Sequence, residues 1–135
     1  MRKYFIVKVK ENGKLEIPLE FAYEIGLVKG AYFLVEIDTN LKEMHIERVA
    51  LPGKKLVEIE VIVEDKPRIL AKVSETLGRL GINILFNEVE ELESLGLSAI
   101  VAIVDISQST ISLDDLKREL EKIKEVKEVK VLDMD

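Results

Sequence analysis

The second half of the sequence contains an ordered succession of two apolar patterns, and this succession limits the possible folds most. Residues 56–63 alternate apolar and acidic residues and then become continuously apolar, which predicts a central β-strand. Over residues 67–80, apolar residues recur every three or four positions, so we expect an amphipathic helix with Pro67 in its first turn. Gly81 is expected to end this helix.

The remaining patterns of this half complete one compact fold. Residues 82–90 and 97–105 predict two strands, and Ser112 is a predicted N-cap of a second helix. The buried stripe of that helix is expected to consist of Leu113, Leu116, Leu120 and Ile123. Residues 126–132 predict a last strand, so the fold class is α+β, with a ferredoxin-like βαββαβ order. We expect a four-stranded antiparallel sheet with both helices on one face.

The first half begins with a different pattern. Apolar residues alternate over residues 5–9 and again over 15–17, and Asn12-Gly13 between them is a strong hairpin-turn signal. Residues 18–25 follow as a short helix with Pro18 at its start and Gly26 past its end. This half is therefore expected to open with a β-hairpin and a helix.

Two further strands are predicted over residues 32–38 and 44–49. His45 falls between two apolar residues of the second strand, and we interpret it as a surface residue. A piece of about 50 residues has too small a core to be secure alone, so we expect a second copy to stabilise it.

Residues 51–55 are predicted to link two domains, 1–50 and 56–135, because Pro52 and Gly53 interrupt the apolar pattern. The chain carries 20 Lys and Arg against 26 Asp and Glu, a formal charge of −6. Up to Gly53 the cations and acids balance, so the net negative charge lies in the second half. The first half is therefore free to approach nucleic acid.

Composition excludes several classes of function. The chain has no Cys, which excludes a disulfide scaffold and a thiolate metal site and favours a reducing compartment. No apolar stretch is long enough to span a bilayer and the start is no signal peptide, so we expect a cytoplasmic protein. Abundant Glu, Lys, Ile and Val are typical of heat-adapted chains. No nucleophile motif, phosphate loop or metal-ligand set is present, so we expect no enzyme, no cofactor and no metal.

Two segments of the second half resemble the ACT domain family: Asp65-Lys66-Pro67-Arg68-Ile69-Leu70 and Leu77-Gly78-Arg79-Leu80-Gly81-Ile82-Asn83-Ile84. The resemblance covers residues 56–133. It implies a regulatory module that associates with other copies and binds amino acids or other small metabolites. The implied ligand-binding residues are Asp65, Lys66, Pro67 and Arg68 in one loop, with help from Asn83.

One position departs from the ACT pattern, because Arg68 replaces the usual Gly after the Pro. A Gly lets a ligand approach backbone amides at a helix N-terminus without meeting a side chain. Arg68 either obstructs that approach or clamps a carboxylate or phosphate of the ligand bidentately. Ligand binding and pure oligomerisation therefore both stay open for this half.

Residues 5–49 resemble the AbrB/MazE/SpoVT swapped-hairpin family, through the segments 9–18, 26–30 and 35–38. This resemblance implies an intertwined homodimer that presents basic strands and loops to DNA. The matching basic positions are Lys8, Lys10 and Lys14, and Arg2 and Lys3 are expected to add phosphate contacts from a mobile tail. The departures are Leu19, where Lys or Arg is frequent, and Glu20 and Glu24 in the short helix.

Two functions follow from these observations. In the first, the chain is a transcriptional regulator that binds DNA as a swapped-hairpin dimer and responds to an amino-acid-like metabolite at the ACT-like half. In the second, it is a metabolite-sensing or oligomerisation module that does not bind DNA and regulates a partner enzyme or protein. The basic first strand favours the regulator, and Glu20 and Glu24 favour the alternative.

Overall fold

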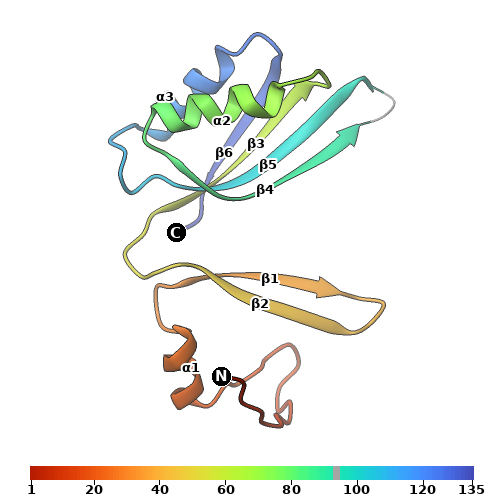
Figure 1. The fold of residues 1–135 in the computed structure, drawn as a ribbon, viewed down its shortest axis with the longest axis vertical. Helices are drawn as coiled ribbons and strands as arrows, with labels where there is room; N and C mark the ends of the chain where they lie inside the picture. Colours follow the sequence, from red (N-terminus) through yellow and green to blue (C-terminus); the bar gives the residue numbers. More distant parts are fainter. Residues whose placement is uncertain (93–94) are drawn as a thin grey trace. The chain divides into compact units, whose positions relative to one another are not determined.

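The structure is a computed structural model that describes residues 1–92 and 95–135 (Figure 1). The chain divides into two compact units, Met1–Gly53 and Lys54–Asp135. Each unit is described by itself below. No helix in the described part of the chain is long and apolar enough to cross a membrane.

The second unit contains four strands and two helices in the predicted βαββαβ order. Its elements are β3 (Leu56–Glu64), α2 (Ile69–Arg79), β4 (Asn83–Leu92), β5 (Leu97–Asp105), α3 (Leu113–Glu121) and β6 (Val126–Asp133). The strands form one antiparallel sheet in the order β4-β5-β3-β6. Both helices cover the same face of this sheet (Figure 1), so the predicted ferredoxin-like fold is confirmed.

Alternation along β3 builds the core of this unit. Val57, Ile59, Val61 and Val63 are completely buried, whereas the intervening residues are half-buried. The helices contribute Leu77 from α2 and Leu116 and Leu120 from α3, each fully buried. Each such side chain contributes about 1.5–3 kcal/mol to folding, so the second unit has a core of its own.

The start of α2 corrects one prediction. Pro67 was expected in the first helical turn, but α2 begins at Ile69 and Pro67 lies before its N-cap. The reason is the backbone of Arg68, which has φ +68° and ψ 6° and so cannot belong to a right-handed helix. The start of α3 agrees with prediction, because the Ser112 side chain caps it by accepting a hydrogen bond from the Asp115 amide.

The first unit contains α1 (Leu19–Ile25), β1 (Tyr32–Asp38) and β2 (Glu43–Ala50). Pro18 occupies the N-cap of α1, and Gly26 ends the helix at φ +74°. The two strands pair antiparallel as an isolated two-stranded sheet. The predicted helix and the second pair of strands are therefore present.

The predicted strands before α1 are absent, since no strand forms over residues 1–18. The turn between them does form, with the Lys14 amide bonded to the Glu11 carbonyl at 3.1 Å and Gly13 at φ +77°. Within residues 1–17 this is the one backbone–backbone hydrogen bond that the described structure contains. A strand needs a partner for its amides and carbonyls, and a single chain supplies none to this segment.

The first unit leaves most of its apolar side chains exposed. In residues 1–53, all of which are described, only Ala22 and Ala50 are buried. Exposed apolar side chains include Tyr4, Ile6, Val9, Leu19, Tyr23, Ile25, Val35, Ile37, Leu41 and Met44. This unit therefore lacks the buried core that the second unit has.

Candidate functional site

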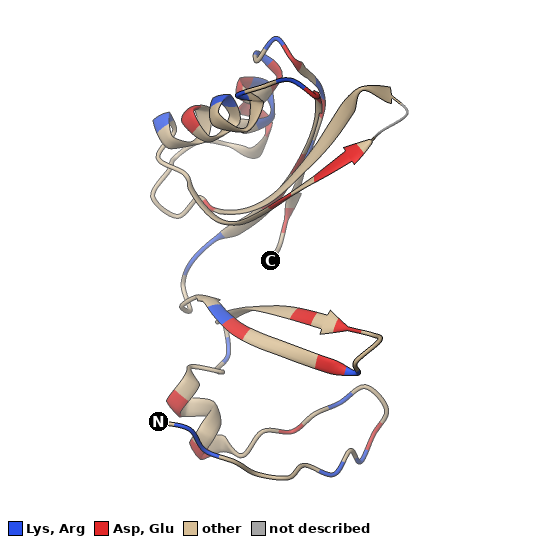
Figure 2. Cartoon of the chain, turned by 45° about the vertical axis from the view of Figure 1, so that its right-hand side comes forward, with Lys and Arg blue, Asp and Glu red and all other residues tan. Residues whose placement is uncertain are grey.

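Three predicted DNA-binding residues come together around the turn at Asn12-Gly13. Lys8, Lys10 and Lys14 line a hollow of about 460 Å³ with Glu11, Leu15 and Glu16. Lys14 forms an exposed ion pair of 3.1 Å with Glu11, and neither Lys8 nor Lys10 forms an ion pair with a described residue. Figure 2 shows blue Lys or Arg positions interspersed with red Asp or Glu positions along the irregular N-terminal segment. The hollow can therefore receive an anionic group such as a phosphate.

The other two predicted DNA-binding residues lie apart from this hollow. Lys3 is not part of a free tail, because its Nζ forms an ion pair of 2.7 Å with Glu24 of α1. The same Nζ lies 5.7 Å from the ring centroid of Phe21, and the Phe5 ring stacks on Phe21 at 4.9 Å. Lys3 therefore contacts α1 through the charge of Glu24 and the aromatic ring of Phe21. Arg2 is exposed and lies next to this contact in the sequence.

The predicted ligand loop of the second unit is held by its backbone. The amide of Asp65 donates to the Gly96 carbonyl at 3.0 Å, and the amide of Lys66 donates to the Glu64 carbonyl at 2.9 Å. The amide of Glu64 donates to the Glu125 carbonyl at 2.9 Å. The loop is thereby tied to the segment before β5 and to the segment between α3 and β6.

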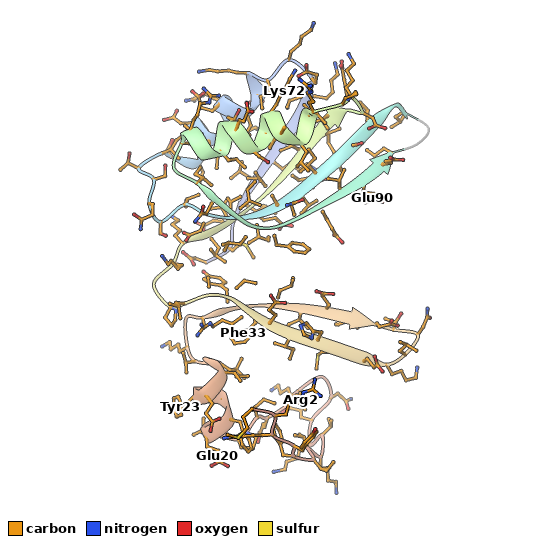
Figure 3. The ribbon with its side chains drawn as sticks, viewed as in Figure 1. Arg2, Glu20, Tyr23, Phe33, Lys72 and Glu90 are labelled. Carbon is orange, nitrogen blue, oxygen red and sulfur yellow. The ribbon has the colours of Figure 1, made fainter. Side chains whose placement is uncertain are left out.

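Lysine–glutamate pairs surround this loop. The Glu64 carboxylate accepts from Lys66 at 2.8 Å and from Lys127 at 2.9 Å, and these two hydrogen bonds lower the pKa of Glu64 to about 2. Lys72 of α2 binds Glu125 at 2.6 Å, and this bond lowers the pKa of Glu125 (Figure 3 labels Lys72). Both carboxylates are therefore charged at neutral pH.

Sequence reasoning identified Lys66 and missed the other four residues of these pairs. Glu64 and Lys66 are two positions apart at the end of a predicted strand, so the sequence could have indicated their ion pair. Glu125 and Lys127 reach the loop only because β6 pairs with β3. No pattern in the sequence indicates that contact.

Arg68 is the exposed cation of this loop that forms no ion pair with a described residue. Its carbonyl accepts from the Lys72 amide at 3.1 Å, which places Arg68 at the N-terminus of α2. A guanidinium at a helix N-terminus adds its charge to the positive end of the helix dipole. This end of α2 can therefore attract a carboxylate or phosphate group.

Asn83 does not lie beside the loop with which it was predicted to act. It pairs with Asp105 at one end of the sheet, where β3 begins, whereas Asp65 and Arg68 follow the other end of β3. The nine residues of β3 separate the two ends by about 26 Å at the usual rise of a strand. A single chain therefore does not bring the five predicted ligand-binding residues together. Among the described residues, no three His, Asp or Glu side chains gather as metal ligands do.

Comparison with solved structures finds similar chains that correspond to about three-fifths of this one. A chain from the complex of the chemotaxis kinase CheA P2 domain with the response regulator CheY, from Thermotoga maritima, is 18% identical with TM-score 0.46. It covers 61% of this chain and 100% of its own length. The ACT domain of GTP pyrophosphokinase from Chlorobium tepidum is 20% identical, with TM-score 0.48, 59% of this chain covered and 100% of its own. The uncharacterized protein TM1266 from Thermotoga maritima is 20% identical, with TM-score 0.45 and 62% and 100% covered.

No curated protein matches the chain. The profile of the ACT domain family matches residues 57–125, which is just over half of the sequence. These residues contain the predicted ligand loop, both helices and the strands β4 and β5 in full. By this match the chain belongs to the ACT domain family.

Proposed function

We propose that the chain is a dimeric DNA-binding regulator without catalytic activity, which responds to an amino-acid-like carboxylate at its ACT domain. Membership of the ACT family gives the second unit a regulatory role in sensing small molecules. The observation that supports DNA binding is the gathering of Lys8, Lys10 and Lys14 around one hollow. The proposed dimer rests on the exposed apolar side chains of the first unit, and the proposed effector site rests on the position of Arg68.

The charge of the first segment supports contact with phosphates. Lys8 and Lys10 form no ion pair with a described residue, so their ammonium groups are available to a phosphate, although Glu11 and Glu16 also line the hollow. A dimer doubles this basic surface, and each neutralised phosphate releases condensed counterions. Binding to DNA is therefore expected to weaken steeply as salt rises.

A second copy of the first unit supplies the missing core. One face of the β1–β2 hairpin contains Val35, Ile37, Met44 and Ile46, which are 40–70% exposed in a single chain. Residues 5–10 and 15–17 also lack backbone partners. A homodimer with interleaved hairpins, as the swapped-hairpin resemblance implies, buries these side chains and pairs these strands.

A second copy also completes the proposed effector site. Asn83 follows α2 and Arg68 precedes it, so the two residues lie beyond opposite ends of a helix of 11 residues, which is about 16 Å long. When two such helices lie antiparallel across a two-fold axis, Arg68 of one copy approaches Asn83 of the other. Arg68 then binds the carboxylate of the effector, and Asn83 offers an amide to its other polar groups.

Regulation requires that the effector favour one arrangement of the dimer. An effector that stabilises the arrangement with the higher DNA affinity by about 1–3 kcal/mol changes that affinity by about 5–150-fold. The same coupling makes DNA change the affinity for the effector by an equal factor.

The alternative is a metabolite-sensing or assembly module that regulates a partner and does not bind DNA. The ion pairs of Lys3 with Glu24 and of Lys14 with Glu11 favour it, because two of the five proposed DNA-contacting cations already have an acidic partner. Glu20 on the same short helix adds negative charge nearby (Figure 3).

The test is retention of mixed genomic DNA fragments at low and moderate salt, with recovery and sequencing of the retained fragments. The chain is compared with Lys8→Glu/Lys10→Glu and with the control Lys117→Glu/Lys124→Glu, which makes the same charge change on exposed lysines of the second unit. We expect enrichment of particular fragments, lost in the first variant and kept in the control. Absence of retention at low salt rejects the DNA-binding function and leaves the alternative.

A further inference from the structure

The turn that carries the basic hollow also contains a chemically reactive dipeptide, Asn12-Gly13. The backbone nitrogen of the residue after an asparagine can attack the asparagine side chain. A glycine in that position has no side chain to hinder the attack. Asparagine is for this reason a thermolabile residue, and its position in the fold decides whether it reacts.

The geometry at Gly13 leaves the attacking nitrogen free. The turn is closed by the Lys14 amide, and the Gly13 amide has no hydrogen-bond partner among the described residues. Gly13 has φ +77° and a Cβ placed there would meet nothing within 4 Å. Asn12 and Gly13 are both exposed. The turn therefore has the space to rearrange.

The other three asparagines are protected in ways that Asn12 is not. The Leu41 amide, which follows Asn40, donates to the Asp38 carboxylate at 2.9 Å. Asn83 and Asn87 lie within β4, where they and the residues that follow them belong to a paired strand. Each of these three is also followed by a residue with a bulky side chain.

We infer that Asn12 is a site of spontaneous modification, at which deamidation places a negative charge in the turn between Glu11 and Lys14, two residues that line the basic hollow. The Gly13 nitrogen forms a bond to the side-chain carbonyl carbon of Asn12, and the bond from that carbon to the side-chain nitrogen breaks. Ammonia leaves with the proton from the Gly13 amide, and a succinimide ring remains. Water then adds to one of the two ring carbonyl carbons, the bond from that carbon to the Gly13 nitrogen breaks, and the nitrogen takes up a proton. Attack at the side-chain carbonyl yields aspartate, and attack at the main-chain carbonyl yields isoaspartate. No oxidant or reductant takes part.

The new carboxylate changes the charge of the hollow. Three lysines and two glutamates line it, so its lining carries one net positive charge, and a carboxylate at Asn12, next to Glu11 in the sequence, opposes that charge from the adjoining turn. The isoaspartate product also lengthens the main chain inside the turn that Glu11 and Lys14 close. If the hollow holds DNA phosphates, as the proposed function states, the modified chain binds them more weakly. The modification itself does not rest on the proposed function.

The first experiment follows deamidation by mass. The intact chain is incubated at mildly alkaline pH and raised temperature, digested, and each asparagine peptide is measured with fragmentation that separates aspartate from isoaspartate. We expect the Asn12 peptide to lose its amide first, with both products present, while the Asn40, Asn83 and Asn87 peptides keep theirs. Asn12→Gln abolishes the early mass change. Loss of the amides at equal rates, or later loss at Asn12, overturns the inference.

The second experiment measures the effect of the charge. Asn12→Asp and Asn12→Gln are compared for DNA retention over a salt series, and we expect half-retention to shift to lower salt only for Asn12→Asp. Equal retention of the two variants overturns the effect on the hollow. If the unmodified chain retains no DNA even at low salt, the proposed function fails, and selective deamidation of Asn12 still supports the modification site.

Discussion

Replacing Arg68 by glycine tests whether the left-handed backbone at the start of α2 stores strain. An L-residue in this conformation costs about 1–2 kcal/mol relative to one in a right-handed conformation, and glycine does not incur that cost. Arg68 has φ +68°, so Arg68→Gly relieves the strain. Glycine also loses more backbone entropy on folding, about 0.4–1 kcal/mol. The expected net change is a small stabilisation of the second unit.

The matched variant is Arg68→Ala, which removes the same guanidinium and keeps the strain. Arg68 forms no ion pair with a described residue, so the two variants lose the same interactions. We expect Arg68→Gly to be more stable than Arg68→Ala by about 0.5–1 kcal/mol, the strain less the entropy of glycine. For a unit of this size that difference corresponds to a melting temperature roughly 2–8 °C higher.

The assay is urea unfolding followed by circular dichroism, with thermal melts in parallel and protein concentration held equal. Equal stability of the two variants would refute the strain argument. In a thermal-shift screen against amino acids, we expect an amino acid that stabilises the unmodified chain to lose its effect in both variants. A retained shift in Arg68→Ala would exclude the guanidinium as the carboxylate clamp.

Three further predictions concern the second unit. The pKa of Glu64 is lowered from 4.5 to about 2, so its ion pairs stabilise the fold above pH 4.5. This stabilisation is lost as the pH falls toward 2. In thermal melts over this pH range, we expect Glu64→Gln to remove that part of the acid dependence of stability. Leu116→Ala empties a fully buried position of α3 and costs about 2–5 kcal/mol in urea unfolding, and a loss below 1 kcal/mol would mean that the core collapses around the gap. Ser112→Ala removes the cap that the Asp115 amide uses and costs about 0.5–2 kcal/mol, which Ser112→Asn should largely restore.

The fold of the second unit could be predicted because the apolar faces of its strands and helices pack against one another within the unit. Alternation in β3 places Val57 and Ile59 on the face that α2 and α3 cover, and the sequence contains all of these elements. The prediction failed at Pro67, where the local rule that proline favours the first helical turn is overridden by the conformation of the next residue. The rule describes proline alone, whereas the helix start depends on Arg68.

The candidate ligand site could be predicted only in part. The loop residues Asp65 and Arg68 are neighbours in sequence, so one motif suffices to indicate them. Glu125 reaches the loop through the pairing of β6 with β3, which brings together residues about 60 positions apart. Asn83 was grouped with the loop by family pattern, and the strand register separates them within one chain. Patterns in a single sequence report local structure, whereas the positions of Glu125 and Asn83 depend on how the strands pair.

The structure of the first unit was harder to predict, because its strand patterns require pairing partners and a buried core that a single chain does not supply. Residues 5–17 alternate as strands do, and their turn forms with Gly13 at positive φ, yet the arms stay unpaired. The same unit buries only Ala22 and Ala50. Unpaired arms and an exposed apolar face of β1–β2 are the two consequences expected when strands and core are completed by a second copy. This mismatch between pattern and structure is the observation that supports our proposal of a dimeric first unit, while the second unit has a core of its own.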